Sequence, residues 1–346
     1  MSNTKIRVQD IADALHLSRV TVSKALNHHP SVPENTTRRV FEKAIEMNYK
    51  FLGDSRFSGL IDEQKNSPGQ IAVLFSKYID KQHIGFSILS RLSDILGEKN
   101  YSVSLYFISK KNLESGQLPD AFAAHQISAI LCVEIFHEQY SRMLCNLGKP
   151  VIFLDAYPSF LTDQIPADVL LTESRYSFSR IIRKIIQDHG LERIGFVGPY
   201  LHCLSFFERW QGYQIALAQE NIPYAPQYCI LSNDDDLYWH SELIASRLRM
   251  MNPLPQLFVC ANDALAIHLM SSLHEMKYRV PEDIRVLGFD NSPAAALSHP
   301  RLTTVDANSH AIGTLAARIL LERIAFPGQP NTAFFVQSRF IPGQSA

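Results

Sequence analysis

A short segment near the amino terminus carries side chains whose chemistry suits the reading of DNA bases. Arg19, Val20 and Lys24 fall on the outer face of an expected helix. Arginine can donate two hydrogen bonds to guanine, valine can contact a thymine methyl group, and lysine can bind guanine or phosphate. The hydroxyls of Thr21 and Ser23 suit phosphate oxygens. The segment therefore predicts a surface that lies in a DNA groove.

Three short helices would position these side chains. The first has apolar residues at helical spacing, namely Val8, Ile11, Ala12 and Leu15. The second is expected from about residue 19 to 27, with Ser18 as its N-cap and Val22 facing the first helix. The third is expected from about residue 34 to 48. A helix-turn-helix of this kind places its second helix in the major groove, whereas the plainer alternative is a small bundle without a role in DNA binding.

A second group of polar side chains follows expected strands further along the chain. Asp155, Asn262 and Asp290 come at or just after strand ends, Arg209 begins an expected helix, and Phe86 begins another. Ligands of open parallel sheets bind at the carboxyl ends of the strands. A guanidinium with carboxylates suits polyols, sugars, nucleosides or small anions, and Phe86 could stack on such a ligand. Plainer roles stay open, since Arg209 could pair with a surface acid and Asn262 or Asp290 could cap a helix.

Beyond residue 69, short apolar runs alternate with longer helical patterns. We expect strands over residues 71–75, 103–107, 129–133, 151–154, 169–171, 194–197, 257–261, 286–289 and 334–339. We expect helices that include residues 86–99, 178–188, 209–220, 241–250 and 264–276. This alternation predicts parallel sheets with helices on both faces. About 275 residues is long for one such sheet, so we expect two lobes with a cleft between them.

The charge of the chain is unevenly distributed. The 346 residues include 33 Lys and Arg and 34 Asp and Glu, a net charge of −1, which by itself disfavours a nucleic-acid partner. The first 60 residues, here called the head, hold nine basic and six acidic residues, a net +3 that leaves −4 for the rest. Attraction to DNA is therefore expected at the head alone.

Several classes of protein are disfavoured by what the sequence lacks. The five cysteines form no C-x-x-C pair, which predicts a reduced protein with neither disulfides nor a zinc site. We see no signal peptide and no apolar run of about 18 residues, so we expect a cytoplasmic protein without membrane contact. Motifs for nucleotide binding, serine hydrolysis and zinc proteolysis are missing, and we expect no enzyme activity, no cofactor and no metal.

The head resembles that of the lac/Gal repressor family of bacterial transcription regulators. Residues 17–27 read L-S-R-V-T-V-S-K-A-L-N, where the family shows V-S-x-x-T-V-S-R-V-L-N. Residues 32–40 and 44–49 likewise resemble the segments V-S-x-x-T-R-x-R-V and A-x-x-x-G-Y. The resemblance implies contacts with operator DNA by Arg19, Val20, Thr21, Ser23, Lys24, Asn27 and Arg56.

The sequence departs from the family at the hinge that follows the head. The family pattern is Y-x-P-N-x-x-A-R-x-L, whose leucine wedges into the minor groove. This chain keeps Tyr49 and Arg56 but has other residues at the remaining positions, namely Phe51, Leu52, Ser55 and Ser58. Either Phe57 or Leu60 supplies the wedge, or the segment is a plain linker, and the sequence leaves both open.

The body also resembles the family, across residues 70–340. The matching motifs lie at residues 191–198, 208–213, 259–266, 280–291 and 300–305. They imply a two-lobed periplasmic-binding-protein-like fold in which Arg209 and Asp290 bind an effector. Asn262, Asp155 and Phe86 are further candidates for contact with that effector. The expected organisation is a small all-α helix-turn-helix head with hinge (1–60), a linker (61–69) and an α/β effector-binding and dimerisation body (70–346).

The resemblance and the residues together predict a DNA-binding transcription regulator, most simply a repressor. It would bind a pseudo-palindromic operator as a homodimer and respond to a sugar or nucleoside-like effector. The alternative is a solute-binding receptor with the same body fold and no regulatory DNA role. The sequence names neither the effector nor the operator, nor whether the effector releases DNA or promotes its binding.

Overall fold

The chain divides into two compact units, Met1–Pro68 and Gly69–Ala346. The computed structural model describes residues 7–26, 32–47, 69–76, 84–232 and 241–346. The first unit contains the head, and the second contains the body. Each unit has its own buried apolar core, so each is described by itself.

The head is built from three helices, α1 (Val8–Leu15), α2 (Arg19–Leu26) and α3 (Glu34–Glu46). Their shared core is formed by Ile11, Ala12, Val22, Ala25, Leu26, Val40 and Ala44. His16 ends α1 in the left-handed region at φ 54°. The Ser18 hydroxyl then accepts a hydrogen bond from the amide of Thr21 at 3.0 Å, which caps the start of α2. The predicted helix-turn-helix is confirmed.

The first lobe of the body, here the N-lobe, has a six-stranded sheet in the order β10-β5-β4-β3-β1-β2. Every neighbouring pair is parallel. The strands are β1 (Gln70–Phe75), β2 (Ser102–Phe107), β3 (Ile127–Val133), β4 (Val151–Leu154), β5 (Asp168–Glu173) and β10 (Ala333–Gln337). The inner strands are near-continuous apolar runs because both faces of the sheet are covered.

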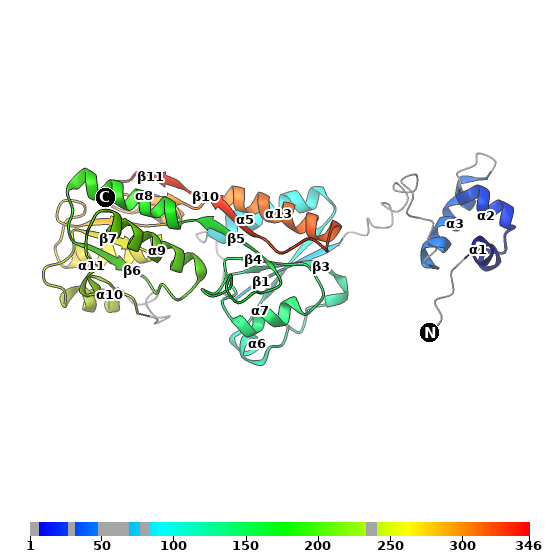
Figure 1. Cartoon of the computed structure of the whole chain (residues 1–346), viewed down its shortest axis with the longest axis horizontal. Helices are drawn as coiled ribbons and strands as arrows, with labels where there is room; N and C mark the ends of the chain where they lie inside the picture. Colours follow the sequence, from blue (N-terminus) through cyan, green and yellow to red (C-terminus); the bar gives the residue numbers. More distant parts are fainter. Residues whose placement is uncertain (1–6, 27–31, 48–68, 77–83, 233–240) are drawn as a thin grey trace. The chain divides into compact units, whose positions relative to one another are not determined.

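Two pairs of helices cover this sheet, one pair on each face (Figure 1). One face carries α5 (Ile84–Glu98) and α13 (Ser309–Ala325), and the other carries α6 (Lys110–Ser115) and α7 (Glu138–Cys145). Helices α5 and α13 approach closely at Gly313, where an added Cβ would lie 2.6 Å from the carbonyl oxygen of Ile88. A 3₁₀ turn (Ala124–Gln126) precedes β3.

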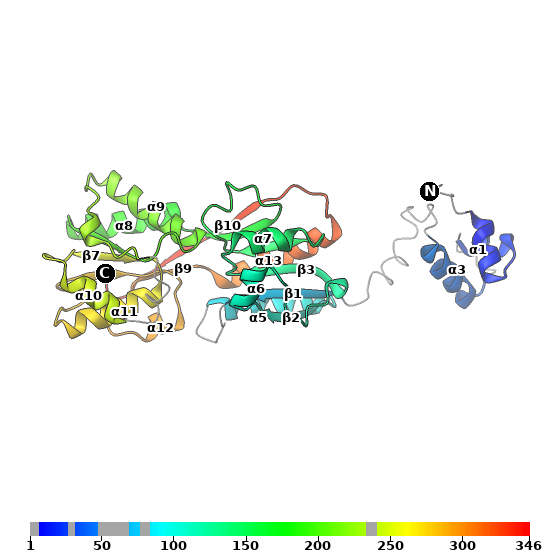
Figure 2. The same cartoon turned by 90° about the horizontal axis from the view of Figure 1, so that it is seen from below.

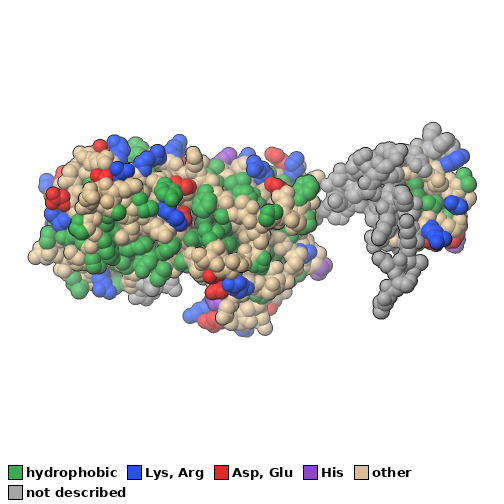
Figure 3. Space-filling view, in the orientation of Figure 1, with side chains coloured by type: hydrophobic (Ala, Val, Ile, Leu, Met, Phe, Trp, Pro, Cys, Tyr) green, Lys and Arg blue, Asp and Glu red, His purple; other side chains and the backbone are tan. Residues whose placement is uncertain are grey.

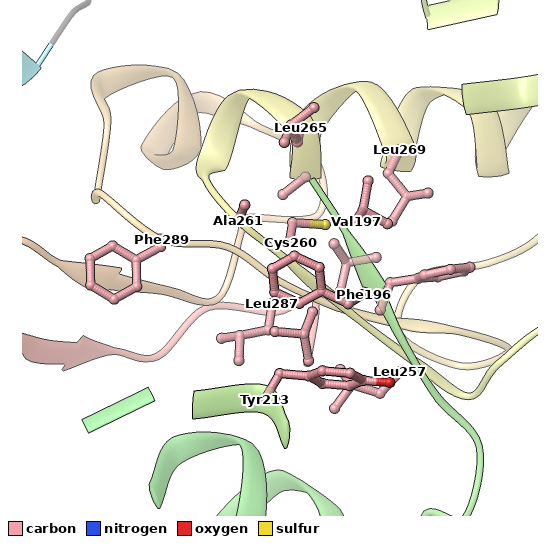
Figure 4. Close-up of a cluster of buried hydrophobic side chains, with 14 of the residues drawn as sticks. Phe196, Val197, Tyr213, Leu257, Cys260, Ala261, Leu265, Leu269, Leu287 and Phe289 are labelled. Atoms are coloured by element: carbon pink, nitrogen blue, oxygen red, sulfur yellow. The ribbon is translucent and has the colours of Figure 1, made fainter. Parts of the chain in front are cut away.

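The second lobe, here the C-lobe, has a parallel sheet in the order β6-β7-β8, namely β6 (Ile194–Val197), β7 (Leu257–Cys260) and β8 (Arg285–Leu287). Helices α8 (Arg175–His189) and α9 (Leu204–Gln219) lie on one side, and α10 (Ser241–Arg249) and α11 (Asp263–Glu275) on the other (Figure 2). A short 3₁₀ turn (Pro226–Tyr228) and α12 (Pro293–Leu297) complete the lobe. Phe196, Tyr213 and Leu287 lie in its central cluster, and Phe289 lies at one side of that cluster (Figure 4).

The chain crosses between the lobes at three places, after β5, after β9 (Thr304–Asp306), and between β10 and β11 (Arg339–Ile341). Strands β9 and β11 pair antiparallel in the C-lobe. Side chains join the crossings, since Thr172 Oγ1 donates to the Ala307 carbonyl at 3.1 Å and the Ser177 and Ser338 hydroxyls lie 2.7 Å apart. The predicted single strand 334–339 is therefore wrong. It is two strands in different lobes, because the backbone turns away from β5 at Ser338 and continues along β9.

Most predicted strands and helices agree with the structure within a few residues. The predicted strand at 151–154 coincides with β4, and the one at 194–197 coincides with β6. Helices α6, α7, α12 and α13 and strand β9 were not predicted. Helix α13 has small and apolar residues on more than one side because it is packed between the sheet and α5, so its apolar positions form no simple stripe.

Candidate DNA-binding and effector sites

The outer face of α2 carries the predicted base-reading side chains. Arg19, Val20, Ser23 and Lys24 are exposed, and Val20 keeps 63% of its surface although it is apolar. An exposed valine beside two cations suits a groove lined with thymine methyl groups. Thr21 is half-buried, and its hydroxyl lies 2.8 Å from the hydroxyl of the capping Ser18. Basic side chains are visible on the described surface of the head (Figure 3).

The remaining DNA-binding predictions fall outside the residues that the structure describes. These are Asn27 and Arg56, together with the departures from the family hinge at Phe51, Leu52 and Ser58. Whether the hinge forms a minor-groove helix stays a prediction.

Arg209 is the centre of the predicted effector site in the body. The prediction that Arg209 begins the helix is wrong, because α9 begins at Leu204. Arg209 lies on the second turn of α9, and its side chain is 6% exposed. One terminal nitrogen donates to the Ala261 carbonyl at 2.6 Å, and the other donates to Oδ1 of Asp290 at 3.2 Å. The guanidinium also lies over the ring of Phe289, 3.8 Å from its centroid. These contacts fix the fork in one orientation at the carboxyl ends of the C-lobe strands.

The Nε atom of Arg209 is buried and has no hydrogen-bond partner in the part of the chain that the structure describes. Buried hydrogen-bond donors in proteins nearly always have a partner, so a buried donor without one is unusual. A bound ligand with an acceptor oxygen would supply the missing partner.

Asp290 meets Arg209 from the loop after β8. Its backbone has φ 118°, in the region that side chains rarely adopt, and Asn291 follows at φ 54°. The Asp290 amide donates to the Val305 carbonyl at 2.8 Å, which ties the loop to β9. Two consecutive residues with positive φ indicate a backbone held under strain, as is common at ligand sites.

Asp155 lies after β4 in the N-lobe but bonds to the C-lobe. Its Oδ1 accepts from the amide of Ser205 at 3.1 Å, and its Oδ2 accepts from the Ser205 hydroxyl at 2.6 Å. The carboxylate therefore caps the first turn of α9 across the two lobes. Burial raises the pKa of Asp155, and the hydrogen bonds from Ser205 and from the amide of Ala156 oppose that rise.

Further contacts join the lobes beside Asp155. The amide of Leu204 donates to the Ala156 carbonyl at 2.7 Å. The ring of Phe136 contacts the ring of His202 edge to face, with centroids 5.1 Å apart. The loop before α9 and the first turn of α9 thus contact the N-lobe.

Two predicted effector residues, Asn262 and Phe86, do not contact Arg209 or Asp290 in the hydrogen bonds and ring contacts described above. Asn262 is the N-cap of α11, and its side-chain oxygen accepts from the amide of Leu265 at 3.0 Å, which confirms the capping alternative for that oxygen. Phe86 is 43% exposed and lines a surface recess with a separate set of residues, namely Ser87, Ser90, Arg91, Asp94 and His310. The structure therefore brings Arg209 and Asp290 together, and it places Phe86 in a surface recess that neither of them lines.

Sequence reasoning missed Ser205, Phe289 and Asp263 as members of the site. Ser205 lies four residues before Arg209, on the same face of α9, so helical spacing could have indicated it. Phe289 directly precedes Asp290 in the motif that was recognised. Among the described residues no group of three or more His, Cys, Asp or Glu could hold a metal ion, and no helix there is long and apolar enough to cross a membrane.

These features define a class of protein, a helix-turn-helix DNA-binding domain joined to a two-lobed periplasmic-binding-protein-like domain. Family models match both parts. Residues 7–50 match the model of bacterial regulatory proteins of the lacI family, and residues 186–346 match the periplasmic binding protein-like domain. The chain belongs to the lac/Gal repressor family of bacterial transcription regulators.

Curated relatives and solved structures agree with this assignment. The HTH-type transcriptional repressor PurR of Aliivibrio salmonicida is 26% identical over 327 residues, which cover 92% of each chain. A complex of the transcriptional regulator CelR with cellobiose shares the fold at a TM-score of 0.70 with 18% identity, covering 99% of this chain and all of the other. A lac repressor dimer bound to operator and the anti-inducer ONPF has a TM-score of 0.66 with 17% identity, covering 99% of both.

Proposed function

We propose that the protein is a sequence-specific DNA-binding transcription repressor that a small molecule in the interlobe cleft controls. The observation that carries the proposal is Arg209, a buried guanidinium oriented by Asp290 and Phe289 in a chain that also carries an exposed recognition helix. The relatives named as PurR repressors support the repressor role. A regulator of chromosomal genes would act in the cytoplasm.

The proposed effector carries several hydroxyl groups, as sugars and nucleosides do. Arg209 Nε needs an acceptor, and the Asp290 carboxylate can accept from hydroxyls of a ligand while it keeps its bond to Arg209. Solved structures of similar fold contain cellobiose and ribose, which supports the sugar class.

Control would act through the contacts between the lobes. Asp155 bonds to Ser205 on α9, the same helix that carries Arg209, so a ligand on Arg209 and the interlobe contact share one rigid element. A ligand that binds more tightly to one arrangement of the lobes shifts the protein toward it. The difference between the two affinities sets the size of the response.

Two copies of the chain would present two heads to a pseudo-palindromic operator. The edge strand β2 exposes Leu105 and Phe107, at 58% and 53%, on the same face of the strand. An exposed apolar edge strand is unfavourable in a monomer and is normally covered. The proposed homodimer covers it.

One experiment tests both halves of the proposal. An operator is selected from random DNA with the purified chain, and its affinity is measured with and without cellobiose, ribose, adenosine and guanosine. Arg19→Ala should weaken operator binding roughly tenfold or more, on the order of 1–3 kcal/mol, because a bidentate base contact is lost. Arg209→Ala should keep operator affinity and lose the response to the compound that acts on the unmodified chain.

Arg39→Ala is the matched control for the head, because Arg39 is exposed on α3 and carries the same charge away from α2. It should change affinity less than Arg19→Ala and leave the preferred bases unchanged. If the selected DNA shows no common sequence, or if Arg209→Ala responds like the unmodified chain, the proposal is wrong.

A further inference from the structure

Asp263 is a buried carboxylate that joins three segments behind the effector site. It is the first residue of α11 and is 1% exposed. Its Oδ1 accepts from the Thr304 hydroxyl at 2.5 Å, and its Oδ2 accepts from the amide of Ser292 at 2.7 Å. Its own amide donates to the Phe289 carbonyl at 2.8 Å. One residue thus connects α11, the loop after β8 and strand β9.

The loop that Asp263 contacts is the strained one that carries Asp290. Asp290 and Asn291 have φ of 118° and 54°, and such conformations persist only where the surroundings hold them. Gly288, just before the loop, must lack a side chain, because a Cβ there would lie 2.4 Å from Oδ1 of Asp263. The carboxylate occupies the space behind the loop and bonds to its far end at Ser292.

Several groups face the Asp263 carboxylate. Burial and the nearby charge of Asp290 raise the pKa of Asp263 to about 7, and the hydrogen bonds from Thr304 and Ser292 oppose that rise. The thiol of Cys260 at the end of β7 is also close, and burial keeps its pKa well above the ordinary value. The positive charge of Arg209 on α9 is already paired with Asp290. Asp263 is therefore a second negative charge close to Asp290, and only Asp290 is paired with the guanidinium.

We propose that Asp263 is a positioning residue that holds the Asp290 loop and couples that loop to the protonation of its own buried carboxylate. This inference rests on the proposed function, because it concerns the loop that would face the effector. The role belongs to Asp263 through its contacts with the loop, and nothing in it requires Asp263 to touch the ligand.

A proton from solvent can be accepted without breaking the loop contact. When Asp263 is ionised, both oxygens accept, one from Thr304 and one from Ser292. When Oδ1 is protonated, its O–H donates to Thr304 Oγ1, since a hydroxyl can reverse its direction, and Oδ2 still accepts from Ser292. The repulsion of Asp290 then disappears, and the pair of Asp290 with Arg209 becomes tighter.

The first test is the pH dependence of thermal unfolding. The pKa of Asp263 is about 7 in the folded chain and about 3.9 in an unfolded one. Between these values the folded state binds more protons, so stability falls as pH rises. Asp263→Asn keeps the shape of the side chain but cannot titrate. The part of the fall in stability that ends near pH 7 should therefore vanish in this variant. A variant whose melting temperature follows the wild-type pH curve would overturn the inference.

Two further variants test whether the fall in stability with rising pH comes from Asp263. Asp290→Asn removes the repulsion, lowers the pKa of Asp263 and moves the end of the fall to lower pH. Thr304→Val removes a donor that stabilises the carboxylate, so the end of the fall should move to higher pH. Asp155 and Glu208 also have raised pKa values. Their contribution to the fall in stability with rising pH should remain in the Asp263→Asn variant.

The second test is hydrogen exchange of residues 288–292 in the full chain, expressed as protection at each pH. In Asp263→Ala the backbone amides of this segment should exchange at least tenfold faster. In Asp263→Asn they should stay protected, because the side-chain amide oxygen still accepts from the amide of Ser292. If Asp263→Ala does not fold, Thr304→Val supplies the comparison and should expose the same segment. Unchanged protection in both variants would refute the positioning role. These measurements use neither operator nor effector, so their failure is distinct from failure of the proposed function.

Discussion

Two buried arginines in the body differ in how completely their donors are used. Arg323 forms a two-pronged pair with Asp168, with both nitrogen–oxygen distances at 2.6 Å. Its terminal nitrogens also donate to the carbonyls of Gln329 and Pro330, which anchors the loop after α13. Arg209 instead keeps a buried Nε without a partner in the described part of the chain. The first pattern indicates a structural role, and the second leaves a donor for the proposed effector.

Removal of Arg323 should therefore cost stability. Arg323→Met leaves the Asp168 carboxylate, which is 1% exposed, buried without its positive partner, and should lower the free energy of unfolding by about 3–5 kcal/mol. Arg339→Met is the matched control, because Arg339 pairs with Asp306 while its side chain stays 74% exposed. It should cost less than about 1 kcal/mol. Urea unfolding of the three proteins measures the difference, and equal losses would contradict the structural role.

At the scale of elements, glycines set how closely the covering helices pack. An added Cβ at Gly212 on α9 would lie 2.6 Å from the Arg175 carbonyl oxygen on α8. The same conflict arises at Gly313 between α13 and α5. Backbone cannot move aside as a flexible side chain can, so both helix pairs depend on glycine at their crossing points.

Gly212→Ala should lower the free energy of unfolding by about 1–3 kcal/mol because the helices must separate. Gly97→Ala in α5 is the matched control, since nothing lies within 4 Å of its added Cβ. It should leave stability unchanged or raise it by up to about 1 kcal/mol, because alanine favours a helix. Thermal and urea unfolding check both, and a Gly212→Ala protein as stable as the wild type would show that the crossing is less close than described.

At the scale of the whole molecule, the charge distribution favours the proposed homodimer. The head carries a net charge of only +3, so one head makes few phosphate contacts, and two heads on one operator multiply the affinity. Dimer formation and operator binding should therefore be lost together.

The two edge strands of the N-lobe sheet, β2 and β10, provide a matched test. Leu105→Glu places a charge on the exposed apolar face of β2 and should convert the dimer to a monomer with much weaker operator binding. Phe335→Glu places the same charge on β10, where Phe335 is 44% exposed, and should leave the dimer intact. Sedimentation and operator titration measure both. Loss of the dimer in Phe335→Glu alone would move the interface to the other edge.

Much of the fold could be predicted from the sequence because the relevant signals are local. The spacing of Ile11, Ala12 and Val22 predicts the head core, and the apolar runs predict the parallel strands. Arg209 and Asp290 were predicted as partners in one site, and they meet at 3.2 Å. The predictions for residues 27, 56 and the hinge remain predictions, since they lie outside the described residues.

By itself, the sequence determined the helix-turn-helix and the two-lobed α/β plan, and it predicted Arg209 and Asp290 as effector contacts. Only the tertiary structure decided which distant groups meet. Asp155 and Ser205 are 50 residues apart and lie in different lobes, and Asp263 reaches Thr304 across 41 residues. Local spacing does not predict such pairs, because they form only when the fold brings together segments that are far apart in the chain.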